Sequence, residues 1–271
     1  MGPIHHYTSD SPGGRVTKRI VVIPDTQIPF DDSRLLRAVV RFIGDWQPDE
    51  VIHIGDLMDY PSPARWSKGS AEEFYPVMLE HNEQAKKRLL GPLRKVYDGP
   101  IGIHEGNHDL RPREYLTKYA PALAEFEGAF HIKHLLDFDG FGITLLPDFN
   151  EFAPDWVTTH GHRGQMGIAR VAGSTALNGA KRFNKSVVMG HTHRLGLITE
   201  SFGFGSVVGK QVTGFEVGNL MNMEQASYLK GGTGNWQQGF GILTVDGPYV
   251  KPEVVPIMNG RFAVDGEIWK V

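Results

Sequence analysis

Five short polar segments of this chain carry side chains that can bind metal ions or move protons. In chain order they are Asp25-Thr26-Gln27, Gly55 to Asp59, Gly106 to Asp109, His160-Gly161-His162 and Gly190 to His193. Their carboxylates, imidazoles and amide oxygens are ligands that hard-to-borderline divalent cations prefer. About seven candidate ligands are too many for one tetrahedral ion and suit two. Two ions about 3.5–4 Å apart can activate a water and clamp the oxygens of a phosphoryl group.

The composition narrows the classes of protein and of site. The chain has 271 residues and a formal net charge of −3, which argues against a globally basic nucleic-acid-binding protein but not against a local basic patch. Because the sequence contains no cysteine, disulfides, Cys-ligated metals and thiol nucleophiles are excluded. No apolar run approaches the roughly 18 residues of a membrane-spanning helix. We therefore expect a cytoplasmic protein without membrane contact.

The five polar segments follow expected β-strands. Apolar, β-branched or turn-bounded runs predict strands at 19–24, 49–55, 99–104, 141–146, 156–160, 186–190, 195–201, 207–212 and 239–245. Helices are predicted at 31–44, 71–90 and 115–126. The alternation of strands and helices in the first half favours parallel strands with crossover helices. Since ligands bind at the carboxyl ends of such strands, we expect the five segments to meet.

The organisation along the chain indicates an α/β protein of one domain, residues 18–271, with two sheets packed face to face and helices outside. Residues 1–17 predict a mobile leader, because they are polar and rich in Gly and Pro and lack the apolar core of a secretory signal. Residues 164–185 predict a basic helix. It is either a solvated face or a cap segment that grips a nucleic-acid backbone.

The five segments read D-x-[H/Q], G-D-x-x-D, G-N-H-D, H-G-H and G-H-x-H, and this order resembles the calcineurin-like metallophosphoesterase superfamily. The resemblance extends over about residues 20–200. Residues 24–30 and 234–241 are similar, more narrowly, to metallophosphoesterases carried by actinobacterial phages. The resemblance implies a four-layer α/β/β/α sandwich of two mixed sheets flanked by helices. It also implies a metal-dependent phosphoric ester hydrolase.

The resemblance implies two divalent metal ions that share one bridging carboxylate, Asp56. The implied ligands of the first ion are Asp25, Gln27, Asp56 and His193. The implied ligands of the second ion are Asp56, Asn107, His160 and His191. Mn²⁺ is the expected metal, with Mg²⁺, Fe²⁺ and Zn²⁺ as alternatives.

A catalytic role for His108 is also implied by the resemblance. His108 would hydrogen-bond the phosphate and protonate the leaving oxygen, with Asp109 orienting its ring, while a metal-bridging hydroxide attacks phosphorus. Asn107 is a further implied substrate contact. Arg111 and Arg113 follow closely and are either solvated charges or phosphate-steering cations.

Gln27 departs from the family pattern, which usually has His at this position. An amide oxygen is a weaker and harder ligand than imidazole, so the first site should bind metal less tightly and favour Mn²⁺ or Mg²⁺ over Zn²⁺. Alternatively, Gln27 does not ligate and a water takes its place. Asp59 is expected to orient a neighbour or to cap the following segment. His162 has either a structural role or a role close to the ligands and substrate.

The leading functional prediction is a phosphodiesterase for a small or nucleotide diester, because a positioned acid assists a poor alkoxide leaving group. The first alternative is a DNA or RNA nuclease acting on a nucleic-acid end. Residues 164–185 would discriminate the two, since a small-molecule enzyme should tolerate their neutralisation. An alternative of another class is a non-catalytic scaffold that binds metal. Gln27 favours this alternative because it departs from the family pattern, whereas the presence of His108 argues against it. The oligomeric state and the role of the Gly-rich segment after residue 200 stay open.

Overall fold

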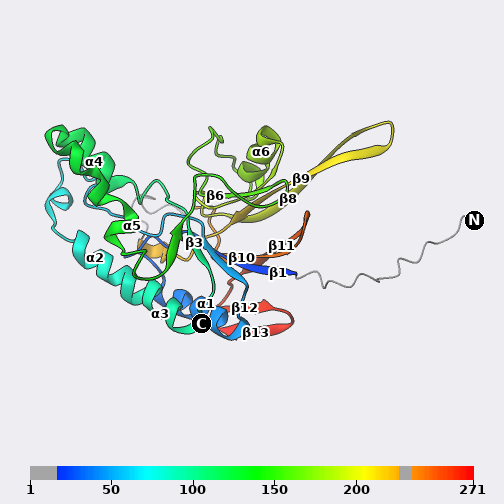
Figure 1. Ribbon diagram of the computed structural model, residues 1–271, viewed down its shortest axis with the longest axis horizontal. Helices are drawn as coiled ribbons and strands as arrows, with labels where there is room; N and C mark the ends of the chain where they lie inside the picture. The colour runs from blue at the N-terminus through cyan, green and yellow to red at the C-terminus, as the bar shows by residue number, and fades with distance from the viewer. Residues whose placement is uncertain (1–16, 226–233) are drawn as a thin grey trace, which may run out of the picture.

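The computed structural model describes residues 17–225 and 234–271 (Figure 1). The predicted leader, residues 1–17, lies outside the described residues except for Thr17. Residues 226–233 of the Gly-rich segment also lie outside them. In the described part of the chain, no helix is long and apolar enough to cross a membrane.

Two mixed β-sheets form the centre of the fold. The strands of the first sheet are β1 (Lys18–Ile23), β2 (Glu50–His53), β3 (Ile101–Ile103), β4 (Ile143–Leu145), β10 (Gly239–Asp246) and β11 (Tyr249–Pro256). The strands of the second sheet are β5 (Asn150–Ala153), β6 (Trp156–Thr159), β7 (Ser186–Met189), β8 (Leu195–Phe204) and β9 (Val207–Val217). The orders are β11-β10-β1-β2-β3-β4 and β5-β6-β7-β9-β8. Strands β1 to β4 run parallel to one another, as do β6, β7 and β9.

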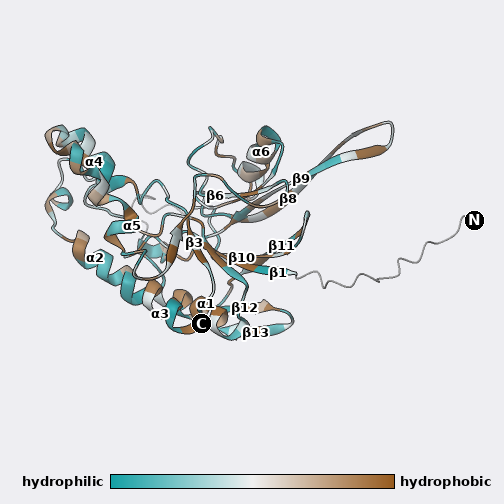
Figure 2. Cartoon of the chain, in the orientation of Figure 1, coloured by the Kyte–Doolittle hydropathy of each residue, from teal (hydrophilic) through white to brown (hydrophobic). Residues whose placement is uncertain are grey.

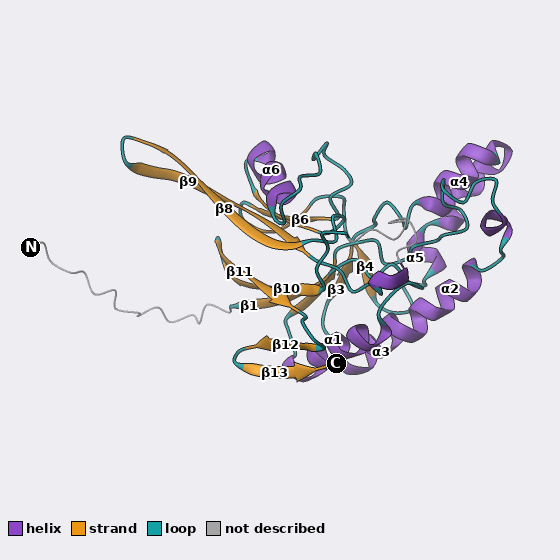
Figure 3. Ribbon diagram, turned by 180° about the vertical axis from the view of Figure 1, so that it is seen from behind, coloured by secondary structure: helices purple, strands orange, loops and turns teal. Residues whose placement is uncertain are grey.

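Helices and short turns complete the fold. The helices are α1 (Ser33–Trp46), α2 (Met78–Ala85), a π-helical turn (Lys86–Leu90), α3 (Gly91–Val96), α4 (Arg111–Tyr119), α5 (Ile132–Leu135) and α6 (Ser174–Phe183). The 3₁₀ turns are Ala71–Phe74, Pro121–Phe130 and Met223–Gln225. A hairpin of β12 (Arg261–Val264) and β13 (Glu267–Lys270) packs on α1, where Phe42 and Trp269 meet edge to face. The tip of the β8–β9 hairpin extends well beyond the other strands of the second sheet (Figures 1 and 3).

Three apolar cores hold four layers together. Val21 and Ile23 of β1 pack toward α1, whereas Ile20 and Val22 belong to the core shared with the second sheet. This alternation follows from the period of two in a β-strand. A third core joins the second sheet to α6 through residues such as Ala180. The predicted α/β/β/α sandwich of two mixed sheets is therefore confirmed.

The outer helix α1 is amphipathic, as its sequence predicts. Its apolar residues, including Leu36 and Val39, are buried, and Arg34 and Arg37 are exposed. Figure 2 shows that α1 carries both hydrophobic and hydrophilic residues. The side chain of Asp32 caps the helix by accepting from the backbone N–H of Arg34 at 3.0 Å. Burial of this apolar face against the first sheet fixes the strands that carry the polar segments.

The helix predicted over 71–90 is wrong at both ends. Ala71–Phe74 forms one 3₁₀ turn, and the helical segment begins only at Met78, after Pro76. It then continues past residue 90 to Val96. Pro92 lacks the N–H that would bond to the carbonyl four residues earlier, which is consistent with the wide π-helical turn that precedes it.

Residues 164–185, expected to be either a solvated basic face or a cap segment, contain one helix, α6, from Ser174 to Phe183. Helix α6 packs on β7 and β9 as an outer layer of the sandwich. Its Lys181 pairs with Glu200 at 2.8 Å, and Lys185 after its end pairs with Glu151 at 2.6 Å. These cations therefore lie on the outer face of the second sheet. The loop before α6, which includes Ile168, is the part of the segment that reaches the site.

Candidate metal centre

Each of the five polar segments follows a parallel strand. Asp25 comes after β1, Asp56 after β2 and Asn107 after β3 in the first sheet. His160 comes after β6 and His191 after β7 in the second sheet. The structure brings these side chains together at one edge, where the parallel strands of both sheets end.

The first group of ligand atoms contains Asp25, Asp56 and His193, whose atoms lie within 4.8 Å of one another. His193 Nε2 is 3.1 Å from Asp25 Oδ2 and 3.1 Å from Gln27 Nε2. The buried Oε1 of Gln27 has no hydrogen-bond partner among the residues that the structure describes. A buried amide oxygen without a donor is costly. A cation at this position would satisfy it.

The second group contains Asp56, His160 and His191, again within 4.8 Å of one another. His160 Nε2 is 3.3 Å from Asp56 Oδ2 and 3.1 Å from Asn107 Oδ1. Its Nδ1 lies 3.1 Å from the carbonyl oxygen of Ile54, to which it can donate. Such a bond fixes the ring and points Nε2 toward the ligand oxygens. Asp56 is the residue common to both groups, although its role as a bridge stays a prediction.

The charges at this edge suit cations. Burial opposes ionisation of Asp56, but the charges of His160 and His108 outweigh it and hold the pKa of Asp56 well below its usual range. Burial likewise opposes the charged form of His160, yet the carboxylate of Asp56 raises the pKa of His160 to about 9. The carboxylate thus draws a proton onto the nearest imidazole. Because a metal competes with a proton for such a nitrogen, the donor set fits divalent cations.

His191 differs from His160 in its charge. Burial, reinforced by the charge of His160, lowers the pKa of His191 to about 4. Its ring is therefore neutral near pH 7, and the neutral imidazole is the form that binds a metal.

The backbone is strained where it presents these side chains. Gln27, Asp56, His191 and His193 have left-handed φ values of 47°, 49°, 68° and 58°. A non-glycine residue in this region costs about 1–2 kcal/mol, and such residues cluster at functional sites. The neighbouring Gly106 is required for a different reason, because a Cβ there would overlap the Asp56 carboxylate.

His108 lies beside the ligand groups, and Asp59 holds its ring. His108 Nδ1 is 2.7 Å from Asp59 Oδ1. Arg111 donates to Asp59 Oδ2 at 3.1 Å and to His108 Nε2 at 3.1 Å. A guanidinium can only donate, so Nε2 accepts and the ring proton lies on Nδ1. His108 Nε2 is also 3.9 Å from Asp56 Oδ2.

The predicted role of Asp109 in orienting the His108 ring is wrong. The buried Asp109 carboxylate accepts from the backbone N–H of Met58 at 2.9 Å and of Gly106 at 2.8 Å. It therefore fastens the loops after β2 and β3 to each other. Asp59, which was expected to orient a neighbour or cap a segment, takes the place next to His108. The second Asp of G-D-x-x-D is the sequence signal that could have identified it.

Two other candidates differ in their relation to the site. Arg113 forms an ion pair with Glu105 and does not line the cavities over the candidate ligands, so of its two alternatives phosphate steering is not supported. The ring of His162 lies 5.3 Å from that of His160, between centroids. Burial lowers the pKa of His162 to about 3. Within the described ranges neither of its ring nitrogens has a hydrogen-bond partner.

A buried carboxylate that the sequence did not single out supports the last ligand loop. Glu216 of β9 accepts from the hydroxyl of Thr192 at 2.7 Å. Its other oxygen accepts from the backbone N–H of Thr175 at 2.8 Å, at the start of α6. Glu216 therefore fixes the loop that carries His191 and His193 to the outer helix.

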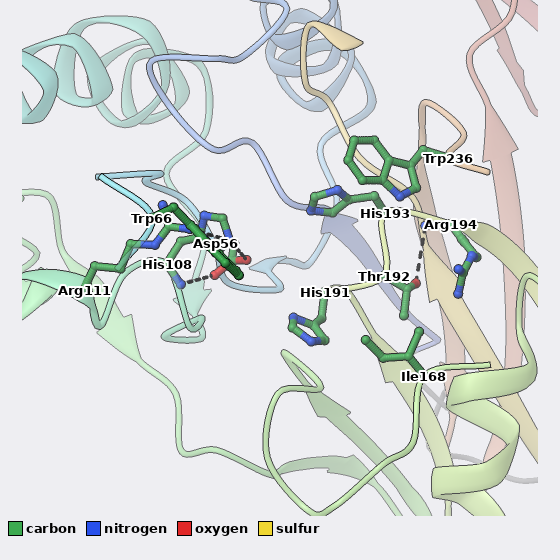
Figure 4. Close-up of a pocket in the computed structure, with 10 residues that line it drawn as sticks. All are labelled: Asp56, Trp66, His108, Arg111, Ile168, His191, Thr192, His193, Arg194 and Trp236. Carbon is green, nitrogen blue, oxygen red and sulfur yellow. Dashed lines mark hydrogen bonds and ion pairs between the residues drawn. The ribbon is translucent and has the colours of Figure 1, made fainter. Parts of the chain in front are cut away.

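Two adjoining cavities open over the ligand groups. The first has a volume of about 410 Å³, and its lining includes Asp56, His108, Arg111, His191 and His193 (Figure 4). The second has a volume of about 760 Å³ and shares His108, Arg111 and His191 with the first. Four of the candidate metal ligands, Asp56, Asn107, His191 and His193, therefore face an open cavity.

Trp66, Ile168 and Trp236 complete the walls of the first cavity (Figure 4). The ring of Trp236 lies 4.6 Å from that of His193, between centroids, and the two meet edge to face. These are single apolar residues in loops, with no spacing that distinguishes them from other loop residues. For that reason they were missed at the level of sequence.

Replacing Gln27 with histidine should tighten metal binding at the first site, and most strongly for Zn²⁺. The imidazole would replace a weaker amide ligand next to His193, and we expect a gain on the order of tenfold or more. Isothermal titration with Zn²⁺ and Mn²⁺ measures the effect, with the exposed Gln211 changed to histidine as a control. An unchanged titration for Gln27→His would show that Gln27 is not a ligand.

Comparison with known proteins gives one matching family. A sequence model of the calcineurin-like phosphoesterase family matches residues 18–195. The Gene 54 protein of Mycobacterium phage D29 is 60% identical over 256 residues, which are 94% of this chain and 100% of that protein. The Gene 54 protein of Mycobacterium phage L5 is 58% identical with the same coverage. The narrower resemblance to phage-encoded proteins is therefore confirmed.

A solved structure of PhoD shares the fold, with a TM-score of 0.52. The likeness covers 91% of this chain and 67% of that chain at 11% identity. The range matched by the family contains every candidate ligand, from Asp25 to His193.

Proposed function

Because this chain belongs to the calcineurin-like phosphoesterase family, we propose that it is a dinuclear, metal-dependent phosphodiesterase. Membership makes it a metallophosphoesterase, that is, a hydrolase of phosphoric esters. The observation that carries the finer proposal is the position of Asp56, which belongs to two groups of ligand atoms and lies next to His108. His108 contacts both Asp59 and Arg111. This arrangement argues against a non-catalytic scaffold.

Two cations are proposed, with Mn²⁺ as the main candidate and Mg²⁺, Fe²⁺ or Zn²⁺ as alternatives. The residues that would hold them are Asp25, Gln27, Asp56, Asn107, His160, His191 and His193. Such cations, when bound, supply an activated water and neutralise charge on the phosphate. A ligand set rich in carboxylate and amide oxygen supports the harder metals.

The side chains beside the ligands bind the phosphate and move a proton. Arg111 lines both cavities and donates to His108 Nε2 at 3.1 Å, and a phosphate oxygen that takes the place of Nε2 can accept this hydrogen bond. Asn107 lines the second cavity and can offer its amide. Once it is released from Arg111, Nε2 can take up a proton and donate it to the leaving oxygen, and the carboxylate of Asp59 stabilises the ring in that charged form.

The preference for diesters follows from this proton donor. An alcohol leaves a diester as a poor alkoxide unless it is protonated, and a positioned acid typically contributes 10²–10⁴-fold. The mycobacteriophage relatives support a place of action in the cytoplasm of an infected bacterium.

The test compares bis(p-nitrophenyl) phosphate with p-nitrophenyl phosphate after chelation and re-addition of Mn²⁺, Mg²⁺ or Zn²⁺. We expect chelation to abolish hydrolysis, Mn²⁺ to restore it best, and the diester to be the better substrate. Phe204→Ala, at the 96% exposed tip of the β8–β9 hairpin, serves as the control with unchanged activity. A folded chain that is inactive with every metal would contradict the proposal. Preference for the monoester would contradict its diester part.

A further inference from the structure

The second cavity leads away from the ligand groups along helix α4. It begins at Asn107, His108 and His191. The part beyond the ligands is lined by Arg65, Trp66, Tyr115, Lys118 and Tyr119 and is called the α4 groove here. Its volume of about 760 Å³ falls within the range of about 300–1,000 Å³ that holds a drug-sized ligand. Space therefore exists for groups attached to a phosphate at the metal centre.

Aromatic rings line the path from the ligand groups into the α4 groove. Trp66 lines both cavities and is 72% exposed. Tyr119 is 37% exposed and lies farther along the groove. The guanidinium of Arg65 lies 4.1 Å from the Trp66 ring centroid, and Lys68 lies 4.1 Å from that of Tyr119. One face of each ring is thus occupied by a cation, and a nucleobase would stack on the opposite face.

The charges along the groove are of one dominant sign. Arg65, Arg111 and Lys118 line the cavity, whereas Glu114 is the single acidic side chain among its lining residues. Arg111 is paired with Asp59, so Arg65 and Lys118 against Glu114 leave a small local excess of positive charge, in contrast with the net charge of −3 for the whole chain. A cationic channel with aromatic platforms is the combination by which proteins hold single-stranded nucleic acid.

A paired duplex does not suit this groove, because stacking on Trp66 requires a base that is free of its own stack. The cations of the basic segment 164–185, for which a nucleic-acid contact was one of two alternatives, lie elsewhere. Lys181 and Lys185 form ion pairs on the outer face of the second sheet and do not line either cavity. The cationic and aromatic residues that favour nucleic-acid binding therefore lie on α4 and in the loop that contains Trp66.

We propose that the α4 groove binds a single-stranded nucleic acid whose scissile phosphate lies at the metal centre. The substrate class is thus an oligonucleotide strand, with a base on Trp66 and flanking phosphates near Arg65 and Lys118. This inference rests on the proposed phosphodiesterase function. Hydrolysis consumes one water, whose oxygen joins phosphorus as one P–O bond breaks. The products are a terminal phosphate monoester and a hydroxyl that receives its proton from His108.

The test measures binding of a fluorescein-labelled oligothymidine of about a dozen nucleotides by fluorescence anisotropy, in chelator so that no cleavage occurs. We expect the single strand to bind more tightly than a duplex of the same length. Trp66→Ala should weaken binding about tenfold, with Trp66→Phe close to wild type, because stacking needs only an aromatic face. Lys118→Ala should lower the slope of log K against log salt concentration by about 0.7, the loss of one phosphate contact.

Two matched variants control for general effects of substitution. Phe204→Ala removes an exposed aromatic ring from the hairpin tip, and Arg37→Ala removes an exposed cation from α1. Both should bind the strand as the wild type does. The proposal is overturned if Trp66→Ala binds like Phe204→Ala, or if the duplex binds as tightly as the single strand.

Failure of the groove can be told apart from failure of the metal centre. If the wild type hydrolyses bis(p-nitrophenyl) phosphate with Mn²⁺ but does not bind the oligothymidine, the α4 groove is refuted and the phosphodiesterase stands. If the wild type binds the single strand more tightly than the duplex but hydrolyses neither bis(p-nitrophenyl) phosphate nor the oligothymidine with any metal, the phosphodiesterase is refuted. The α4 groove then stands as a binding site only.

Discussion

Asp56→Asn should lower kcat/KM for bis(p-nitrophenyl) phosphate on the order of 10³-fold or more. Loss of a residue that only orients a ligand typically costs 10–100-fold, and Asp56 would serve both ions, so a larger loss is expected. Asparagine keeps the shape of the side chain and tolerates left-handed backbone. The fold should therefore survive the change while the carboxylate is lost.

The measurement combines steady-state kinetics with the metal content of dialysed protein. Asp155→Asn is a matched control, since Asp155 also has a left-handed φ, 62°, but is exposed in the turn between β5 and β6. We expect its kinetics and metal content to equal those of the wild type. Wild-type kcat/KM in Asp56→Asn would refute the shared-ligand assignment.

His108→Ala should slow the hydrolysis of poor leaving groups by about 10²–10⁴-fold. Activated leaving groups such as p-nitrophenolate need little protonation, so their loss should be much smaller. A series of aryl methyl phosphates whose phenols differ in pKa measures the difference, and the variant should depend more steeply on the leaving group. His134→Ala, an exposed histidine outside the cavities, is the control. An equal loss for every ester would remove His108 as the proton donor.

The same series separates the two carboxylates that could support His108. Asp59→Asn should reproduce part of the steeper dependence, because Asp59 Oδ1 lies 2.7 Å from His108 Nδ1. Asp109→Asn should instead lower thermal stability, because its carboxylate accepts backbone N–H bonds from Met58 and Gly106. A steeper dependence in Asp109→Asn but not in Asp59→Asn would reverse our assignment.

The layers of the fold and the position of the site could be predicted from the sequence, because both depend on local patterns of apolar and polar residues. Residues 19–24 can be buried on both faces only as an inner strand, and β1 (Lys18–Ile23) is such a strand between two layers. Polar residues directly after inner parallel strands are carried to the same edge by topology alone. Asp25, Asp56 and His191 therefore met where the pattern placed them.

The remaining errors concern choices that depend on distant parts of the chain. Asp109 is adjacent to His108 in sequence, yet its side chain points into the β2 loop, while Asp59 comes from that loop to the ring. The course of the helical segment depended on Pro76 and Pro92, not on its apolar spacing. No periodicity marks Trp66, because a loop residue acquires its position from the elements on either side.

The backbone is left-handed at Gln27, Asp56, His191 and His193. This strain lowers the stability of the fold at the positions that the proposed activity requires. Glycine at any of these positions would relax the backbone. Residues of this kind are retained only while function selects them, a trade-off common to active sites. If selection acted on thermal stability alone, we expect that descendants of this protein would lose the metal centre before they lost the sheets that carry it.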